Sequence, residues 1–578
     1  MKTSLIAHTL QLLLASTVHY GVSAAARWNK LSQNNVEERY DRGGVASEAQ
    51  ECSDIGKSIL KMGGNAVDAV VATTFCVGVV APYHSGIGGG GFMLVRAPNG
   101  TYEAIDFRES VPSQVDPSYY NGRPGGTVFG GPAVAVPGEV RGLHHAHQKY
   151  GKLGWAVVMK GAIRVAEDGF ILNSDFMTYI DRAVRGKNSN FLVEDPSWAE
   201  DFADYGHLKQ VGDTITRKRY AKTLAAIAEE GPDAFYNGSI TREMVKTLHK
   251  KGAVIQNSDF SHYKIETREV FNDTIGNFRL FTFGAPSSGA VALQIVKVAN
   301  RFNDKYSRGA DDWHYFTEAM RFGYAARGKL GDPYFDPNIT AFEMAMLDDN
   351  TTENIVDRIE RYRTLPVEDY GPEGVYAVEN HGTSHISTAD SDGYAVSLTT
   401  TVNLLFGSQI MCDKTGVVFN NEMDDFSLPG VKNEFGFQPS PYNYILPRKR
   451  PMSSIANFIV ENEDGTFYAV VGAAGGSRII SATASVLSRM LTDTPGGDLM
   501  GIKEAVAAPR LHDQLMPNRL LVETSFNGNV VAELRKRGHA IEYMPPGLSI
   551  VEGVMQHRSG TFEVGSDPRQ SNHGGARV

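Results

Sequence analysis

The sequence predicts a large α/β protein of the α+β type, with a helix-rich first part and a β-rich last part. Its 578 residues are too many for one ordinary core, so either two or more lobes or one large multilayer domain is expected. Residues 142–362 carry helix caps and breakers, whereas strand-like patterns dominate after residue 383. The expected helices are 153–167, 214–230, 240–252, 288–302, 311–328 and 529–538. The expected strands are 278–283, 384–389, 394–401, 455–460, 466–471, 519–523, 540–544 and 553–564.

The composition is that of a folded protein without a nucleic-acid partner. Hydrophobic residues make up 42% of the chain and charged residues 21%, which is typical of globular domains. The 56 basic and 66 acidic residues give a net charge of −10, so no dominant basic field exists to attract phosphates.

The first residues resemble a secretory signal peptide. Lys2 supplies a positive start, an apolar run follows, and small residues before Ala24 favour cleavage there. The alternative is an uncleaved membrane anchor, but polar residues interrupt the run, and it falls short of the roughly 20 residues that span a bilayer. We therefore expect residues 1–24 to be removed and the protein to be secreted or vacuolar, without a stable membrane anchor.

Acceptor triplets for N-glycosylation support the secretory prediction. Such triplets also arise by chance, so each is weak alone. All of them precede residue 383, which suggests that the later segment is more buried. They begin at Asn99, Asn237, Asn272, Asn338 and Asn350.

The chain has three cysteines, and their spacing leaves two interpretations open. Cys52 and Cys76 bracket a helical region and can form a bridge in an oxidising compartment, which leaves Cys412 unpaired. Alternatively, all three are buried thiols. No C-x-x-C pair supports a redox or zinc site.

Two helices and a glycine-rich turn are expected near the start of the mature chain. The first helix begins near Asp54, and Asn65 caps a second helix that continues to Val80 and is apolar nearly all round. The glycines of 85–91 match the spacing of a dinucleotide fingerprint, but that fingerprint needs a strand before it and a helix after it. Here the order is reversed, so we expect a tight turn into an inner strand, close to other chain or to a ligand.

A partner strand at 102–107 leads to Arg108. An arginine in this position is either part of a surface ion pair or a clamp for a carboxylate. The spacing alone favours the surface ion pair.

Residues 379–387 combine a Gly-Thr-Ser step with two histidines, and three chemistries can use them. His381 and His385 have the i,i+4 spacing of metal ligands, but a strand would point the two rings in unrelated directions, so no metal is expected. A serine hydrolase lacks support because no G-x-S-x-G elbow occurs in the chain. The third chemistry is a cut before Thr383, whose new α-amine would serve as the base for its own hydroxyl.

A second hairpin ends in Gly475-Gly476, directly before a helix expected at about 477–491. Free N–H groups and the positive end of the helix dipole make such a place suitable for an oxyanion. A purely structural turn is the commoner use of two glycines.

Several ordered motifs resemble the γ-glutamyltransferase (γ-glutamyltranspeptidase, glutathione hydrolase) family, and the resemblance extends from about residue 45 to Arg569. They include Asp106-Phe107-Arg108-Glu109, Val136-Pro137-Gly138, the helix around Glu318 to Asp332, Gly382-Thr383-Ser384-His385, Thr401-Val402-Asn403, Asn420 to Phe426, Lys449 to Ser454, and Gly475-Gly476.

The resemblance implies a fold and a set of roles. The fold is the N-terminal nucleophile hydrolase αββα four-layer sandwich, without a cofactor. Thr383 would cut the Gly382–Thr383 bond and then act as nucleophile, held by Thr401, with Gly475 and Gly476 as the oxyanion hole. The α-carboxylate of the glutamyl group would bind Arg108, Ser453 and Ser454. Its α-ammonium would bind Asn403, Glu422 and Asp425.

The resemblance also implies partners and products. Residues 25–382 would form a large subunit and 383–578 a small one, acting on glutathione, its S-conjugates and other γ-glutamyl compounds, with water, amino acids or dipeptides as acceptors. A Cys52–Cys76 bridge resembles one in animal members. Two alternatives are an unprocessed, non-catalytic paralogue that binds glutamyl ligands and an acylase-type specificity on the same fold.

Overall fold

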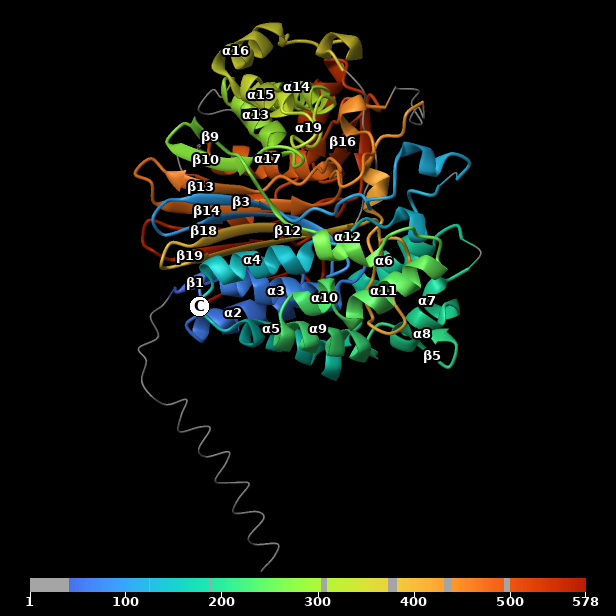
Figure 1. The fold of residues 1–578 in the computed structure, drawn as a ribbon. Coiled ribbons are helices and arrows are strands. Elements are labelled where there is room, and N and C mark those ends of the chain that lie inside the picture. Colours follow the sequence, from blue (N-terminus) through green and yellow to red (C-terminus); the bar gives the residue numbers. More distant parts are fainter. Residues whose placement is uncertain are drawn as a thin grey trace, which may run out of the picture. The chain divides into compact units, whose positions relative to one another are not determined.

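Two antiparallel sheets pack face to face in this protein, and helices cover the outer side of each (Figure 1). The structure is a computed structural model that describes residues 41–578 except 124, 188, 303–308, 373–381, 431–438 and 493–498. The predicted signal peptide, residues 1–24, lies outside the described residues. Asp41–Val578 forms one compact unit, so the multilayer domain is the correct one of the two expected arrangements.

The first sheet has seven strands and contains the residues around the predicted cleavage point. Its two central strands, β11 and β12, form the predicted hairpin at 384–401, with the turn at 391–394. The strand order is β20 (Gly574–Arg577), β1 (Gly43–Ser47), β11 (Gly382–Asp390), β12 (Ala395–Asn403), β2 (Gly90–Arg96), β3 (Tyr102–Asp106) and β8 (Glu266–Arg268).

The second sheet has six strands and leads to the predicted oxyanion site. The strand order is β19 (Phe562–Ser566), β18 (Ile550–Gln556), β14 (Phe467–Ala474), β13 (Phe458–Asn462), β10 (Phe278–Phe283) and β9 (Val270–Ile275). A smaller sheet consists of β15 (Leu511–His512), β16 (Leu520–Glu523) and β17 (Ile541–Met544).

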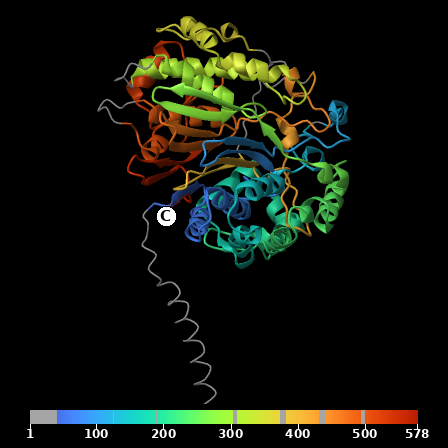
Figure 2. The same cartoon turned by 60° about the vertical axis from the view of Figure 1, so that its left-hand side comes forward.

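Helices form the two outer layers, and both views show them separated by the sheets (Figure 1, Figure 2). The layer over the first sheet includes α2 (Gln50–Lys61), α3 (Ala66–Val80), α4 (Glu139–Tyr150), α5 (Trp155–Asp168), α9 (Lys218–Glu230), α10 (Asp233–Tyr236), α11 (Ser239–Lys250) and α12 (Asn257–His262). The layer over the second sheet includes α13 (Gly289–Asn300), α14 (Ala310–Arg327), α15 (Asn338–Leu347), α16 (Asp349–Arg358), α17 (Arg478–Met490) and α19 (Gly528–Lys536).

Helix α3 confirms the prediction of a capped and fully buried helix. Asn65 and Asp68 form a reciprocal capping box at its start, and every residue from Ala66 to Val80 is buried. The following glycines let β2 approach its neighbours closely: a Cβ on Gly89 would lie 2.0 Å from the Thr401 carbonyl oxygen. The turn therefore serves close backbone packing, as expected from the order of the elements.

The interface between the sheets contains polar side chains as well as apolar ones. Asn457, directly before β13 of the second sheet, donates to the backbone oxygens of Phe92 and Ser397 on the first, at 3.0 Å each. Gly472 leaves room for the ring of His385, because a Cβ there would lie 2.2 Å from the ring. The second sheet therefore fixes the position of the strand that contains Thr383.

Four expected elements differ clearly from the structure in their bounds. Helix α2 begins at Gln50 and not near Asp54. Residues 214–215 form β7, which pairs with β4 (Phe170–Ile171), so helix α9 begins only at Lys218. Strand β13 begins at Phe458 and not at 455, and residues 452–455 line the site described below. The strand expected at 553–564 is wrong as a single element: β18 and β19 form a hairpin, with a turn at 558–560.

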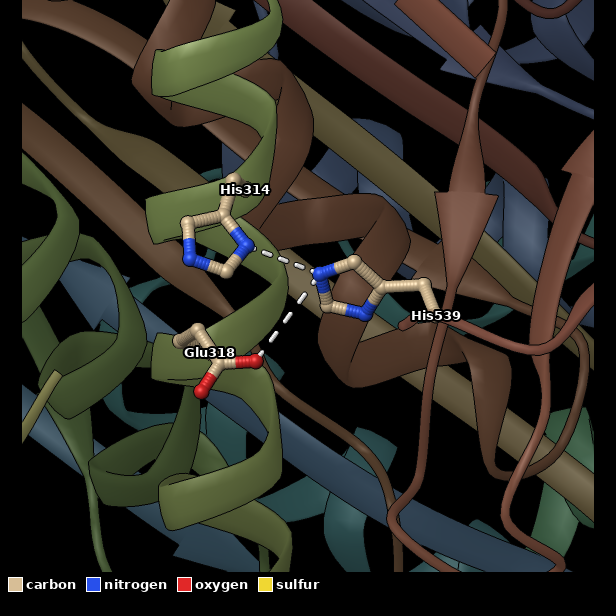
Figure 3. A group of neighbouring side chains, drawn as sticks. All are labelled: His314, Glu318 and His539. Carbon is tan, nitrogen blue, oxygen red and sulfur yellow. Dashed lines mark hydrogen bonds and ion pairs between the residues drawn. The ribbon is translucent and has the colours of Figure 1, made fainter. Parts of the chain in front are cut away.

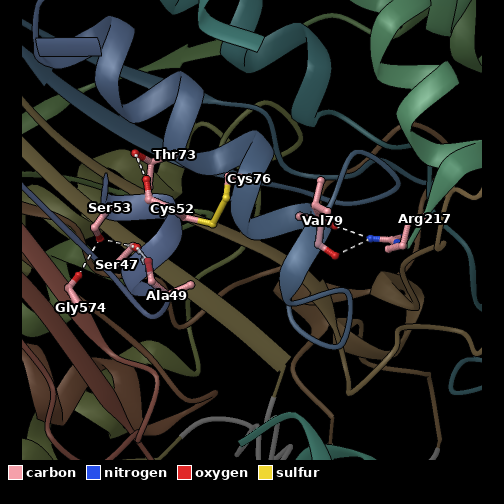
Figure 4. Close-up of a disulfide and its surroundings, with 10 residues drawn as sticks. Ser47, Ala49, Cys52, Ser53, Thr73, Cys76, Val79, Arg217 and Gly574 are labelled. Atoms are coloured by element: carbon pink, nitrogen blue, oxygen red, sulfur yellow. Dashed lines mark hydrogen bonds between the residues drawn. A yellow bond between two sulfur atoms is a disulfide. The ribbon is translucent and has the colours of Figure 1, made fainter. Parts of the chain in front are cut away.

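The Cys52–Cys76 bridge is present and joins α2 to α3 (Figure 4). Cys412 is a buried thiol, as the bridge hypothesis required. In the described part of the chain, no helix combines the length and the apolar character needed to cross a membrane.

The predicted subunits, 25–382 and 383–578, do not correspond to separate halves of the fold. Strands β1, β2 and β3 flank the β11–β12 hairpin in the first sheet, and β9 and β10 complete the second. A cut before Thr383 would therefore leave two chains that share both sheets.

Candidate active site around Thr383

Thr383 lies at an irregularity in the central hairpin of the first sheet. Gly382 pairs with Asn403 and Ser384 pairs with Thr400, and the register shifts between them at Thr383. Such a bulge redirects a side chain out of the regular alternation of a strand. Thr383 is 7% exposed, so its hydroxyl is nearly enclosed.

The hydroxyl groups of Thr383 and Thr401 both contact the carbonyl oxygen of the peptide bond before Thr383. Thr383 Oγ1 donates to the Gly382 carbonyl oxygen at 2.7 Å and lies 3.3 Å from Thr401 Oγ1. Thr401 Oγ1 donates to the same carbonyl oxygen at 2.5 Å and accepts the Asn403 N–H at 2.8 Å. This arrangement places the Thr383 hydroxyl beside a polarised carbonyl. Asn403 itself has a φ of 74°, a strained value typical of functional sites.

A pocket on one side of Thr383 gathers nine of the ten residues to which the resemblance assigned a catalytic or binding role. Gly475, the tenth, lines a separate cavity. We call the first space the charged pocket. It is lined by Arg108, Arg327, Thr383, Thr401, Asn403, Glu422, Asp425, Met452, Ser453, Ser454, Ile455, Gly476, Ser477 and Ile479.

Arg108 is the central cation of the charged pocket. Its guanidinium forms ion pairs with both Glu422 and Asp425, and its side chain is 1% exposed. The surface ion pair that spacing alone favoured is therefore wrong, because the loop containing Glu422 and Asp425 folds over the end of β3. The burial of Arg108 agrees with the other interpretation, a clamp for the carboxylate of a ligand.

Around Arg108, the carboxylate groups outnumber the cations that contact them. A third carboxylate, Glu109, lies 3.9 Å from the Arg108 guanidinium, and burial raises the pKa of Glu109 to about 7. Burial also raises the pKa of Glu422 well above its usual range, although Arg108 opposes the rise. A ligand that brings an ammonium group would supply the missing positive charge.

The rest of the charged pocket offers hydroxyl groups and a second cation. Ser453 Oγ accepts the Ile455 N–H at 3.2 Å. Arg327 Nη2 donates to Ser454 Oγ at 3.2 Å, and Arg327 Nε donates to Ser288 Oγ at 3.0 Å. Sequence reasoning missed Arg327, although it lies on the helix within the Glu318 to Asp332 motif.

Gly475 and Gly476 stand at the end of β14, immediately before α17. Their φ values of 128° and 61° lie in the region that favours glycine. A Cβ on Gly475 would lie 2.5 Å from the Leu548 carbonyl oxygen. Glycine is thus required here for conformation and for space, which supports the predicted oxyanion turn.

A second space lies on the other side of Thr383, and sequence reasoning did not find it. We call it the histidine cavity. It is lined by His84, Tyr179, Arg182, Thr383, Ala474, Gly475, Gly547, Leu548, Ser549 and Ile550. Motif spacing does not reveal it, because its residues come from helix, strand and loop segments that lie far apart in the chain.

Of the two histidines of the opening motif, His385 is the one that the structure describes. His381 lies outside the described residues. His385 is buried between the sheets, where its ring contacts Thr399 Oγ1 at 2.7 Å and Ser387 Oγ at 2.9 Å. Burial lowers the pKa of His385 to about 3, so the ring stays neutral and has a structural role.

One buried cluster elsewhere combines metal-ligand side chains: His314, Glu318 and His539 (Figure 3). His314 Nδ1 and His539 Nε2 are 2.8 Å apart, whereas two nitrogen ligands of a tetrahedral Zn²⁺ lie about 3.3 Å apart. Tyr370 and Thr364 donate to Glu318 at 2.6 and 2.7 Å. As it stands, the cluster is a hydrogen-bonded junction that ties residues 364–370 to α14 and to the turn after α19.

Comparison with known proteins identifies the family. The gamma-glutamyltranspeptidase family model matches residues 52–576. This chain belongs to the gamma-glutamyltranspeptidase family. It is 43% identical to the glutathione hydrolase proenzyme of Arthroderma benhamiae over 96% of each chain. It is 40% identical to a glutathione hydrolase of Aspergillus flavus, over 97% of this chain and 92% of that protein.

Solved structures agree with the predicted fold. The cephalosporin acylase of Bacillus halodurans superposes with a TM-score of 0.81 at 23% identity, covering 93% of this chain and 96% of that one. A chain of the Helicobacter pylori gamma-glutamyltranspeptidase superposes with a TM-score of 0.53 at 29% identity, covering 56% of this chain and 93% of that one. The αββα architecture is therefore the N-terminal nucleophile hydrolase fold.

Proposed function

We propose that this chain is the precursor of a glutathione hydrolase and γ-glutamyltransferase. It cuts itself between Gly382 and Thr383, and the mature enzyme then cleaves the γ-glutamyl bond of glutathione and its S-conjugates. Water, an amino acid or a dipeptide accepts the glutamyl group. Hydrolase activity on glutathione is what the names of the fungal relatives state for those proteins.

The observation that carries the proposal is the composition of the charged pocket. A γ-glutamyl head carries both a carboxylate and an ammonium, so it needs a cationic and an acidic contact beside the nucleophile. Arg108 would pair with the carboxylate, assisted by the hydroxyls of Ser453 and Ser454. Glu422 and Asp425, with Asn403, would then bind the ammonium. The ligand would thus replace the pairs of Arg108 with Glu422 and Asp425 by pairs with its own carboxylate and ammonium, so each buried charge stays paired.

Cleavage of the precursor creates the base for the later chemistry. The freed α-amine of Thr383 has an ordinary pKa of about 7.7–8.0, so part of it is neutral near pH 7 and can accept the hydroxyl proton. Thr401 would hold the hydroxyl in place. The backbone N–H groups of Gly475 and Gly476 would stabilise the oxyanion of the tetrahedral intermediate, and a γ-glutamyl ester of Thr383 would follow.

We also propose the maturation and location of the protein. Removal of residues 1–24 would send the chain into the secretory pathway, and the cut before Thr383 would give subunits 25–382 and 383–578. Exposure of the five asparagines supports their use as glycan sites, since a transferase needs access to them; they are Asn99, Asn237, Asn272, Asn338 and Asn350.

Mass spectrometry of the purified protein, combined with a glutamate-release assay, tests this proposal. Wild type is expected as two chains that begin near residue 25 and at Thr383, and it should release glutamate from glutathione. A chain that stays whole but binds L-glutamate in calorimetry would instead indicate a non-catalytic paralogue. A cut protein that ignores glutathione but hydrolyses another amide would indicate an acylase-type specificity.

A further inference from the structure

The uncut chain needs a proton acceptor that the mature mechanism does not supply. In the mature enzyme the α-amine of Thr383 can act as the base, but before cleavage that nitrogen is an amide and has no basic lone pair. Thr401 cannot replace it, because a neutral hydroxyl is a very weak base and this one already accepts the Asn403 N–H. This need for a proton acceptor rests on the proposed self-cleavage before Thr383.

The histidine cavity contains a suitable group. His84 and Thr383 both line this cavity, and the His84 ring is buried. His84 Nε2 is enclosed and has no hydrogen-bond partner among the described residues. The cavity has a volume of about 20 Å³, which is enough for one water molecule.

Glu48 sets the orientation and tautomer of His84. Its carboxylate accepts from His84 Nδ1 at 2.8 Å, so the proton resides on Nδ1 and the lone pair is on Nε2. Both side chains are about 95% buried, since their exposures are 4% and 5%. The other Glu48 oxygen accepts from the hydroxyl of Ser384, the residue after the nucleophile. One carboxylate therefore connects the histidine to the strand that carries Thr383.

The other candidate acceptors near Thr383 are already engaged. Glu422 and Asp425, which line the charged pocket, both form ion pairs with Arg108. His385 is two residues away in sequence, but its two ring nitrogens contact Thr399 and Ser387. Among the described residues that line the charged pocket or the histidine cavity, His84 is the only histidine.

We propose that His84, oriented by Glu48, accepts the Thr383 hydroxyl proton through one water molecule during cleavage of the precursor. Thr383 Oγ1 forms a bond to the Gly382 carbonyl carbon as its proton passes to His84 Nε2. The C–N bond between Gly382 and Thr383 then breaks, and the proton returns to the leaving nitrogen. The resulting ester of Gly382 with Thr383 Oγ1 is hydrolysed by water, which leaves a carboxylate on Gly382 and a free amine and hydroxyl on Thr383.

The test measures the rate at which the full-length chain becomes two chains after synthesis in a cell-free system. His84→Asn is expected to slow cleavage about 100-fold, the lower end of the range for a lost general base. Glu48→Gln is expected to slow it less, because Glu48 acts only as a positioning residue. The matched control is His145→Asn: His145 also contacts a glutamate, Glu103, at 3.0 Å, but on the outer helix layer, so cleavage should keep the wild-type rate.

Rescue by free imidazole separates proton transfer from a structural role. His84→Gly vacates the ring position, and the partly exposed Arg182 and Gly547 at the cavity lining leave a route for small solutes. Imidazole should restore cleavage of His84→Gly and leave Thr383→Ala uncut. If His84→Asn is slow but imidazole restores nothing, and the unfolding midpoint of the precursor falls, the histidine is structural and the assignment is wrong.

Two further outcomes overturn the assignment and remain distinguishable. If wild type and His84→Asn are cut at the same rate, His84 has no part in cleavage, while the proposed function stands. If wild type itself stays whole, the self-cleavage fails and this assignment fails with it.

Discussion

The charged pocket and the histidine cavity meet at Thr383 but differ in the kind of polar group they present. The charged pocket contains Arg108 with Glu422 and Asp425, all ionic and mutually paired. The histidine cavity contains a ring nitrogen without a described partner, and its one charged group besides the ring is the partly exposed Arg182 among the described lining residues. Ionic groups hold a charged ligand, whereas an unoccupied basic nitrogen transfers a proton. We therefore expect variants on the first side to alter glutamyl binding and variants on the second side to alter bond making.

Thr383→Ala has the largest expected effect, because Thr383 belongs to both spaces. The chain should stay whole, and glutamate release from glutathione should be undetectable, a loss of at least about 10³-fold. Gel analysis and the glutamate assay check both. Thr388→Ala, a buried threonine on the same strand that bonds the Ala66 carbonyl oxygen, is the control and should be cut. A cut Thr383→Ala protein would contradict the assignment of the nucleophile.

Gly475→Ala tests the side of the histidine cavity. The added Cβ would meet the Leu548 carbonyl oxygen and force the φ of 128° to change, which displaces the N–H groups of the turn. Loss of one oxyanion donor lowers kcat by about 10²–10³-fold. KM for glutathione should change much less. Gly465→Ala, at an exposed turn with open space around its Cβ, controls for the loss of a glycine with positive φ.

Arg108→Lys tests the charged pocket. Lysine keeps the charge but loses the fork that contacts two carboxylates, so about 2–3 kcal/mol of binding, or 30- to 150-fold in kcat/KM, should be lost. The loss should appear mainly in KM, and the precursor should still be cut at the wild-type rate. Arg141→Lys, at the exposed pair with Asp233, is the control. If Arg108→Lys slowed precursor cleavage as much as glutathione turnover, the charged pocket would serve both reactions and the division between the two spaces would be wrong.

The smallest expected effect is a pH dependence of glutamyl binding. Burial raises the pKa of Glu109 to about 7, so this group is protonated below pH 7 and ionised above it. Glu109 lies 3.9 Å from the Arg108 guanidinium and does not line the charged pocket, so its negative charge would act on the ligand ammonium only through the local field. L-glutamate should therefore bind the mature enzyme up to about 10-fold more tightly at pH 8 than at pH 6. Calorimetry measures this without turnover. Glu109→Gln should flatten the profile; an unchanged profile would assign the dependence to another group.

The sequence predicted the local elements and most of the candidate site. Helix α3 was defined by Asn65, Asp68 and an unbroken apolar run, which are all short-range signals. The ordered motifs predicted the residues of the charged pocket because their spacing is specific to one family. The same local signals misjudged the long segment at 553–564, where a turn without proline divides the hairpin.

Only the tertiary structure decided the burial of Arg108 and the two sides of Thr383. Arg108 meets Asp425 across 317 residues of sequence, and Ser384 meets Glu48 across 336. Periodicity and capping act over a few residues, so they carry no information on which distant loops converge. Thr383 could be identified from its motif, whereas the groups that would move its proton became visible only when the sheets brought β1, the loop after α3 and β11 together.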